Sequence, residues 1–258
     1  METPIVSINT PTKNRHHFLP LIKKCVESQN FENLEWLILD DTNERFKPLE
    51  SNTAPNIKYI HSNQKITIGE KRNILISEAK GNIIVNFDDD DFYAPQYVTN
   101  VVDTMLKHNF DFLNLRGFFL HHCKENRYGY WDLTKQNGMH YQFGPDEFKI
   151  VEFNESKNRI LPNLSISYGF GYSYRKVVWD NFKVPDLDWK EDVEFALKIK
   201  NDFRLGGLFD NQGLCMHFIH DYNTSRSFPQ YIIPEILINR FFDRKNINEY
   251  VTVGRHRK

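Results

Sequence analysis

Four consecutive aspartates, Asp88–Asp91, directly follow the short apolar run Ile83–Phe87. A run of this length and composition predicts a buried strand, so the carboxylates gather at its C-terminal end. At an effective dielectric constant of about 20, two carboxylates about 5 Å apart repel each other by roughly 3 kcal/mol. A bound cation offsets this repulsion, and Mg²⁺ and Mn²⁺ prefer oxygen ligands. We therefore interpret Asp88–Asp91 as a metal site at the edge of a nucleotide pocket; a solvated acidic turn is the alternative.

Two further acidic pairs lie where strands are predicted to end or helices to begin. Asp40-Asp41 closes the predicted strand Leu34–Leu39, and Glu191-Asp192 opens a predicted helix. Ligands of open α/β sheets bind at the carboxyl ends of the strands, so Asp40-Asp41 is expected at the same edge as Asp88–Asp91, beside the loop Thr10–Arg15. A sugar nucleotide needs such groups: an acceptor for the uracil N–H, acceptors for the ribose hydroxyls and a cation for the diphosphate. For Glu191-Asp192, the alternative is an acid pair favoured by the helix dipole.

The elements that must position these residues alternate between strand and helix. Strands are predicted at residues 5–9, 34–39, 57–61, 83–87 and 110–115, and helices at residues 18–29 and 68–80 and from about Pro95. Gly81 is expected to cap the second of these helices. This alternation predicts an α/β fold with a mostly parallel central sheet and helices on both faces.

The pattern weakens in the second half. Residues 121–163 are polar and punctuated by glycines, which predicts a hairpin and long loops of the kind that often act as lids. Helices are predicted at residues 175–182, 191–200 and 230–242. No repeat or linker-like segment divides the sequence, so we expect a single domain over residues 1–258.

Composition excludes several classes of protein. The net charge of −1 argues against bulk electrostatic binding of nucleic acid or anionic membrane. No apolar run is long enough for a membrane-spanning helix, and Met1–Pro4 does not resemble a secretory signal. The three cysteines, Cys25, Cys123 and Cys215, follow no metal-binding pattern and are expected to be reduced thiols. These features predict a cytoplasmic protein, in the host cytoplasm if the source is a virus.

The motifs of the first hundred residues resemble those of family 2 glycosyltransferases in order and spacing. The matching segments are Pro4–Arg15, Glu35–Asp41, Gly69–Asn73, Ala79–Asn82 and the Asp-x-Asp motif Asp88–Asp90. The resemblance implies a GT-A type, Rossmann-like fold with a nucleotide-sugar-binding half (1–115) and a variable acceptor-binding half with a C-terminal helix (116–258). It implies a metal-dependent, inverting enzyme that moves a sugar from a nucleotide-diphosphate donor, UDP-linked as first choice, to a hydroxyl of a glycan, protein or small molecule.

The resemblance also implies roles for residues of the first half. Asp88 and Asp90 would bind Mn²⁺ or Mg²⁺, with Asp90 in direct contact, and Asp40 would accept the uracil N–H. The other residues expected to contact the nucleotide sugar are Thr10, Pro11, Asn14, Arg15, Asp41, Arg72 and Asp89. Lys13 stands where the family often has Tyr, and Thr42-Asn43 where it often has Gly-Ser, so base stacking and donor choice stay open.

In the second half, Phe170–Lys176 and Trp189–Asp192 resemble the family's acceptor-side strand and Glu-Asp motif. The second acid of that motif is a general base, so Asp192 is expected to deprotonate the acceptor hydroxyl, with Glu191 beside it. A single base with in-line attack implies inversion at the sugar carbon. Gly171 and Trp189 are expected to contact the acceptor, and Trp189 could also be a packing residue.

A late segment, His220–Ser225, resembles a family segment in which a histidine approaches the metal or the diphosphate. His220 is therefore the expected histidine ligand, with His217 in reserve. A neutral imidazole suits Mn²⁺, although a structural role is common for a single histidine.

Other interpretations of the aspartate run agree less well with the sequence. In an EF-hand loop starting at Asp88, the sixth and twelfth positions would hold Gly and Glu, but here they hold Tyr93 and Thr99. A nucleotidyltransferase that makes sugar nucleotides would need a glycine-rich first loop, and Thr10–Arg15 has no glycine. A non-catalytic module that binds sugar nucleotides or glycans is the other competitor, and the presence of Glu191-Asp192 argues against it only weakly.

Overall fold

The computed structural model describes residues 5–51, 54–145, 147–154, 164–221, 223 and 226–255. The chain forms two compact units. The first unit comprises Met1–Asp89, Pro95–Asn114 and Ile166–Leu208, and the second comprises Asp90–Ala94, Leu115–Ser165 and Phe209–Lys258. One boundary between the units lies between Asn114 and Leu115. Residues 166–208, which carry Glu191-Asp192, pack with the N-terminal part of the chain.

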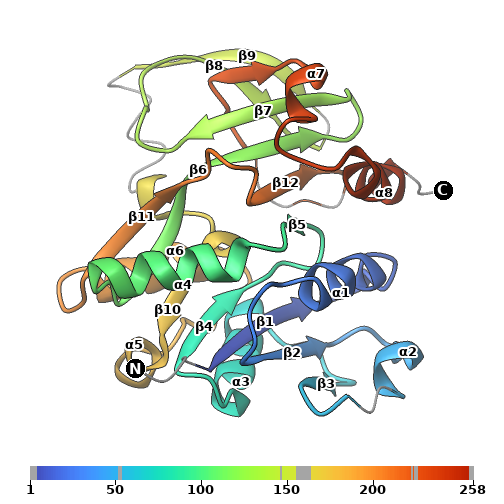
Figure 1. Cartoon of the computed structure of the whole chain (residues 1–258), viewed down its shortest axis with the longest axis vertical. Coiled ribbons are helices and arrows are strands. Elements are labelled where there is room, and N and C mark those ends of the chain that lie inside the picture. Colours follow the sequence, from blue (N-terminus) through green and yellow to red (C-terminus); the bar gives the residue numbers. More distant parts are fainter. Residues whose placement is uncertain are drawn as a thin grey trace. The chain divides into compact units, whose positions relative to one another are not determined.

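A parallel sheet lies at the centre of the first unit (Figure 1). Strand β1 (Val6–Thr12) lies between β2 (Leu34–Asp40) and β4 (Ile83–Asn86), and β3 (Ile57–His61) pairs with β2. The antiparallel strand β10 (Ser173–Arg175) pairs with β4 and with the start of β6 (Phe112–His122). The prediction of a mostly parallel α/β sheet is confirmed.

Apart from the one-turn helix Lys47–Glu50, where no helix was predicted, the helices of this unit follow the predicted pattern. They are α1 (Leu19–Glu27), α2 (Lys47–Glu50), α3 (Ile68–Glu78), α4 (Tyr97–His108), α5 (Lys176–Asn181) and α6 (Glu191–Ile199). Helix α3 begins after Thr67, whose hydroxyl accepts a hydrogen bond from the backbone N–H of Glu70. The predicted capping role of Gly81 is wrong, since Ala79 is the C-cap. Gly81 instead lies against β1, where a Cβ would be 2.5 Å from Ser7 Oγ.

One hydrophobic core fixes the sheet of the first unit to three of its helices. Buried side chains of β2, β4 and β10 pack with α3, α5 and α6; they include Leu37, Ile84, Tyr174, Leu75, Trp179 and Phe195. Burying side chains of this size stabilises a fold by roughly 1.5–3 kcal/mol each. The core therefore holds rigid the strand and helix ends from which the acidic loops emerge.

The second unit is built mainly from antiparallel strands. The remainder of β6 pairs with β7 (Arg127–Asp132) and β12 (Cys215–Ile219). Its other strands and helices are β5 (Phe92–Tyr93), β8 (Gly138–Phe143), β9 (Phe148–Phe153), β13 (Tyr231–Ile233), α7 (Glu235–Ile238) and α8 (Arg244–Arg255). Strand β11 (Leu205–Phe209) also pairs with β6. The antiparallel pair β8–β9 confirms the predicted hairpin.

The predicted helix over residues 230–242 is wrong. Pro234 lies in its middle, and because proline has no N–H and disfavours a helical conformation in the preceding residue, a helix cannot run through it without a break. The segment instead forms β13, then the short α7, which begins directly after Pro234. The true C-terminal helix, α8, begins only at Arg244.

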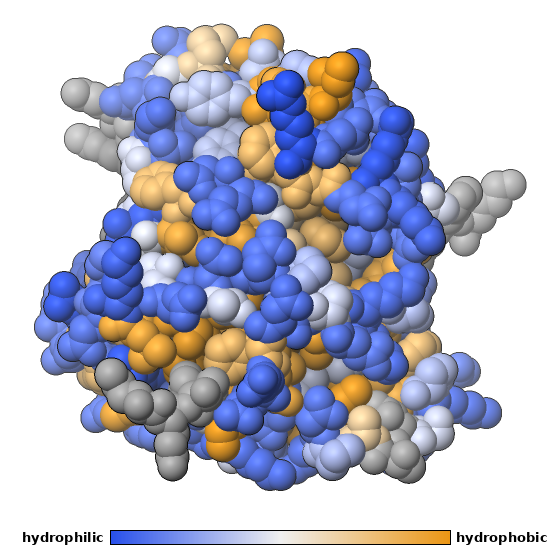
Figure 2. Space-filling view, in the orientation of Figure 1, coloured by the Kyte–Doolittle hydropathy of each residue, from blue (hydrophilic) through white to orange (hydrophobic). Residues whose placement is uncertain are grey.

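No helix within the described residues has the length and apolar character that crossing a membrane requires. The face seen in Figure 2 is largely hydrophilic, with smaller apolar areas between the polar side chains.

Candidate active site

Asp40 belongs to a buried hydrogen-bond network at the end of β2. Its Oδ1 accepts the N–H of Thr42 at 2.8 Å, and its Oδ2 accepts the hydroxyl of Tyr59 at 2.7 Å. His16 Nε2 also lies 2.7 Å from Oδ2. Burial, together with Asp40, raises the pKa of Tyr59, so the phenol stays protonated as a donor. These contacts fix the loop after β2; a bond from Asp40 to a base stays a prediction.

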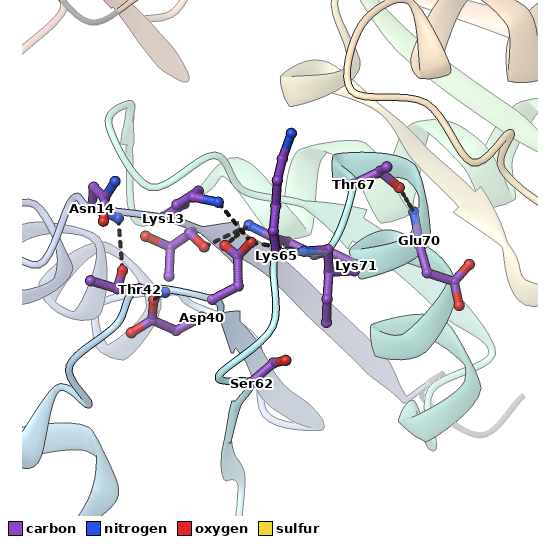
Figure 3. Close-up of polar contacts among 12 residues, drawn as sticks. Lys13, Asn14, Asp40, Thr42, Ser62, Lys65, Thr67, Glu70 and Lys71 are labelled. Atoms are coloured by element: carbon purple, nitrogen blue, oxygen red, sulfur yellow. Dashed lines mark hydrogen bonds and ion pairs between the residues drawn. The ribbon is translucent and has the colours of Figure 1, made fainter.

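Asp41 lies in a second network, with two lysines, Lys13 and Lys71; Figure 3 labels both lysines. The buried Lys71 Nζ forms an ion pair with Asp41 and donates to Thr12 O at 2.8 Å. Lys13 Nζ lies 3.2 Å from the other carboxylate oxygen, which also accepts the N–H of Ile66 at 3.0 Å. Burial opposes ionisation of Asp41, but the bonds from Lys71 and Ile66 outweigh it and lower the pKa of the carboxyl. Asp41 therefore joins the loop after β1 to the start of α3.

Asp89 connects the loop after β1 to the aspartate run. The Thr12 hydroxyl donates to its Oδ2 at 2.5 Å, and Arg15 donates to its Oδ1 at 3.0 Å. Both carboxylate oxygens of Asp89 therefore accept a hydrogen bond within the first unit, and the residue is nearly inaccessible to solvent. Two loops that the sequence predicted to meet at one sheet edge are thus joined.

The other predicted nucleotide contacts lie along β1 and the loop that follows it. Strand β1 continues through Thr10 and Pro11, where a turn was predicted, and Thr10 Oγ1 accepts the indole N–H of Trp36 at 2.9 Å. Asn14 adopts a left-handed conformation, with φ of 55°, which Asn tolerates better than most residues. Its N–H donates to Thr42 Oγ1 at 2.7 Å (Figure 3), so this loop is tied to the loop after β2.

Three carboxylates of the aspartate run fit a divalent cation. Asp88, Asp90 and Asp91 each offer one oxygen, and these atoms lie within 4.8 Å of one another. Asp90 and Asp91 are buried, whereas Asp88 is partly exposed. A set of hard oxygen donors of this kind suits Mg²⁺ or Mn²⁺.

Histidines of the second unit orient two of these carboxylates. His220 Nε2 lies 3.0 Å from Asp90 Oδ2, and His217 Nδ1 lies 2.8 Å from Asp91 Oδ1. Asp91 also accepts the N–H of Phe218 at 3.0 Å. Groups that hydrogen-bond to a ligating carboxylate fix its direction. Direct ligation by His220 stays a prediction, and Thr224 and Ser225 of its motif lie outside the described residues.

Arg72 joins the aspartate run to the Glu-Asp pair. The guanidinium is nearly inaccessible; its Nη2 lies 3.2 Å from Asp88 Oδ1 and its Nε lies 3.5 Å from Glu191 Oε1. Burial raises the pKa of Glu191 to about 7. The attraction of Arg72 lowers this pKa but does not fully compensate for burial, and repulsion by Asp192 raises it further. Glu191 therefore gains or loses its proton near neutral pH.

This pKa predicts how the stability depends on pH. The folded protein holds the Glu191 proton up to about pH 7, whereas the ordinary value for the side chain is 4.5. Between these values the folded state binds more protons than the unfolded state, so the free energy of unfolding falls as pH rises. Glu191→Gln should remove this fall. The free energy of unfolding of the variant, relative to that of wild type, should therefore be up to about 3 kcal/mol higher at pH 8 than at pH 4.5. Denaturant unfolding of both proteins at several pH values measures the effect; parallel pH curves would contradict it.

Asp192 is held in the first turn of α6. Its Oδ2 accepts the N–H of Gly169 at 2.7 Å, and its Oδ1 accepts the N–H of Val193 at 2.7 Å. Gly171 is buried in the same short 3₁₀ helix as Gly169, Gly169–Gly171. Trp189 is 64% exposed, and Lys190 Nζ lies 4.1 Å from the centre of its ring. An exposed indole is suited to stacking on a sugar, which stays a prediction.

The sequence interpretation did not single out Lys71, Gly169 or Asn86, whose Nδ2 donates a hydrogen bond to Gly169 O at 3.0 Å. Asn86 had a signal, because it is a polar residue inside the otherwise apolar run Ile83–Phe87. Lys71 lies in the motif Gly69–Asn73, but no local pattern pairs it with Asp41, and Gly169 had no signal; the contacts of both residues join segments far apart in the chain.

Comparison with known proteins gives one family. The family model described as Glycosyl transferase family 2 matches residues 7–178. The UDP-Glc:alpha-D-GlcNAc-diphosphoundecaprenol beta-1,3-glucosyltransferase WfgD of Escherichia coli is 30% identical over 211 residues, which cover 81% of this chain and 74% of that protein. The putative colanic acid biosynthesis glycosyl transferase WcaA of E. coli K12 is 33% identical over 96 residues, which cover 36% of this chain but only 34% of that protein.

Solved structures support the same fold. The Staphylococcus aureus TarS structure in complex with UDP has a TM-score of 0.61 at 16% identity; the match covers 84% of this chain and 61% of TarS. The mannosyltransferase PcManGT from Pyrobaculum calidifontis, in complex with GDP-Man and Mn²⁺, has a TM-score of 0.59 at 13% identity, covering 84% of this chain and 57% of that chain. This chain thus spans less than two thirds of either structure. The likeness confirms the predicted GT-A type fold.

Proposed function

This chain belongs to glycosyl transferase family 2, and from that membership we propose that it is a metal-dependent, inverting enzyme that moves a sugar from a UDP-sugar to a hydroxyl acceptor. The family makes it a transferase. The UDP-sugar donor, the requirement for a metal and the inversion of the sugar carbon go beyond family membership and are what we propose.

The observation that carries the proposal is the position of Arg72 between two acidic motifs. Arg72 contacts Asp88 of the Asp-x-Asp motif and Glu191 of the Glu-Asp motif, within one compact unit. A donor diphosphate beside Asp88 and an acceptor beside Asp192 would therefore be close enough to react. Buried cationic and acidic groups of this kind cluster at catalytic sites more often than elsewhere.

In the reaction, Asp192 accepts the proton of the acceptor hydroxyl as its oxygen attacks the anomeric carbon. The bond from that carbon to the diphosphate oxygen breaks on the opposite side, and its electron pair leaves with the nucleoside diphosphate, so the carbon is inverted. Asp88, Asp90 and Asp91 would hold Mn²⁺ or Mg²⁺, which when bound neutralises charge on the diphosphate. Arg72 contributes a fixed positive charge near the same place.

The choice of UDP rests on the similar proteins. Structures of TarS contain UDP and UDP-GlcNAc, and the E. coli relative is named for UDP-Glc, whereas PcManGT contains GDP-Man. The acceptor named for the E. coli relative is a GlcNAc-diphosphoundecaprenol. For this chain we propose an acceptor hydroxyl on a glycan, protein or small molecule, and a lipid-linked sugar belongs in the acceptor panel.

Nucleotide release from a donor panel tests the proposal. The purified chain is incubated with UDP-Glc, UDP-GlcNAc and GDP-Man, with Mn²⁺ or with EDTA, and free nucleotide is measured. We expect UDP release from at least one UDP-sugar with Mn²⁺ and none with EDTA. Thermal stabilisation by donors without turnover would indicate a binding module. Pyrophosphate release from a nucleoside triphosphate and a sugar phosphate would indicate a nucleotidyltransferase.

A further inference from the structure

Asn86 is a buried amide at the end of β4, immediately before the acidic segment. Its side chain is 1% exposed, and its Nδ2 donates to the backbone oxygen of Gly169 at 3.0 Å. Its backbone N–H donates to Tyr172 O at 2.9 Å. Burying an amide side chain lowers the stability of the fold unless the amide is hydrogen-bonded. A polar residue at this buried position therefore suggests a specific structural or functional role. The two bonds fasten both ends of the segment 169–172 to the central sheet.

The peptide groups of Gly169 are held from two sides. Asn86 binds its oxygen, and Asp192 Oδ2 accepts its N–H at 2.7 Å. A chain of hydrogen bonds therefore runs from the sheet, through one glycine, to the carboxylate proposed as the general base. All three residues belong to the first unit.

The glycine allows a close approach that other residues would prevent. A Cβ at position 169 would lie 2.8 Å from Asp192 Cβ and 3.2 Å from Asp192 Oδ2. The carboxylate therefore rests directly on this backbone. Its position depends on where the segment 169–172 is held.

Backbone strain occurs on both sides of this junction. Tyr168, directly before Gly169, has φ of 74°, and Lys190, two residues before Asp192, has φ of 64°. Left-handed conformations of such residues cost of order 1 kcal/mol or more each and persist only where surrounding contacts impose them. Strain of this kind clusters at functional sites.

We propose that Asn86 is a positioning residue that fixes Gly169, and through it the Asp192 carboxylate, at the geometry needed for proton transfer. This inference rests on the proposed function of Asp192. A displacement of about 1 Å in a reacting group can cost around 10²-fold in rate, so a loosened Gly169 should lower turnover without weakening donor binding.

Asn86→Leu is the test, and Asn9→Leu is its matched control. Asn9 lies opposite Asn86 in the β1–β4 register and is fully buried, but its amide has no hydrogen-bond partner within the described part of the chain. Both variants remove a buried amide from the same sheet, and only Asn86→Leu removes the bond to Gly169. We expect Asn86→Leu to lower kcat about 10- to 100-fold, with the donor KM within about twofold of wild type. Asn9→Leu should keep kcat within about threefold.

Hydrogen exchange provides a measurement that does not depend on activity. The Gly169 amide should exchange at least about tenfold faster in Asn86→Leu than in wild type or Asn9→Leu. If Asn86→Leu does not fold, Gly169→Ala tests the same junction, because its Cβ would displace Asp192. That variant should show the same loss of kcat with an unchanged donor KM.

The outcomes separate this inference from the proposed function. If wild type transfers sugar and Asp192→Asn does not, but Asn86→Leu behaves like Asn9→Leu in turnover and in Gly169 exchange, the positioning role is overturned and the proposed function stands. If wild type turns over no donor, the proposed function fails. In that case, an unchanged hydrogen-exchange rate of the Gly169 amide in Asn86→Leu would also overturn the inference that Asn86 fixes Gly169.

Discussion

Asp192→Asn should lower turnover by roughly 10²–10⁴-fold and leave the affinity for the UDP-sugar near that of wild type. Asparagine has almost the same shape as aspartate, but its amide cannot take a proton from the acceptor hydroxyl. The contacts of Asp192 to the N–H groups of Gly169 and Val193 use oxygen as the acceptor, and the amide oxygen can retain one of them. The loss should therefore lie in kcat, measured by UDP release under saturating donor, while calorimetry reports donor binding.

Glu194→Gln provides the matched control. Glu194 is an exposed acid in the same first turn of α6, so its substitution removes the same charge from the same helix end. If the acids of this turn act only through the helix dipole, Asp192→Asn and Glu194→Gln should have similar activities, and both should be slightly less stable than wild type. Wild-type turnover in Asp192→Asn would rule out the role of this carboxylate as the base.

The N-terminal part of the first unit could be predicted from the sequence because its elements depend on local patterns. Apolar runs and helical periodicity predicted β1 to β4 and α3 within a few residues, and the parallel arrangement follows from their alternation. That arrangement correctly predicted that the loop after β1 and the aspartate run meet, as they do at Asp89.

Contacts that depend on distant pairing could not be predicted. The bond from Asn86 to Gly169 exists because β10 adds antiparallel to β4, and no local pattern indicates which strand becomes that neighbour. The pairing of Lys71 with Asp41 likewise depends on how α3 packs on the sheet. The error at residues 230–242 has a different cause: a sequence with scattered apolar residues fits a helical period, but Pro234 divides it.

The predicted roles of Asp40 and Asp41 illustrate a further limit. Sequence reasoning treats an acid at a strand end as available to a ligand. In the structure Asp40 already accepts hydrogen bonds from Thr42 and Tyr59, and Asp41 is paired with Lys71. Networks of this kind hold a loop in place whether or not one oxygen also contacts a base. A strand-end acid therefore does not by itself predict which of its oxygen atoms would bind a ligand.

Asp90→Ala should abolish the Mn²⁺-dependent part of UDP binding while the fold stays intact. The variant removes one of three carboxylates whose oxygens lie within 4.8 Å of one another. The two that remain, Asp88 and Asp91, are also held by Arg72 and His217, which restricts how far they can move to compensate. We expect the affinity for UDP with Mn²⁺ to fall by roughly 30-fold or more, a loss of about 2 kcal/mol, to the value that wild type has in EDTA.

Calorimetric titration of UDP, with and without Mn²⁺, measures this effect. Asp103→Ala, on the exposed face of α4, controls for the loss of one negative charge elsewhere in the chain. Asp90→Ala also leaves His220 Nε2 without this carboxylate, so the melting temperature of each variant is needed to separate a binding loss from a folding loss. A folded Asp90→Ala protein that binds UDP as wild type does, with the same gain from Mn²⁺, would remove Asp90 from the metal site, because a carboxylate that contacts the ion cannot be deleted without changing the affinity for that ion.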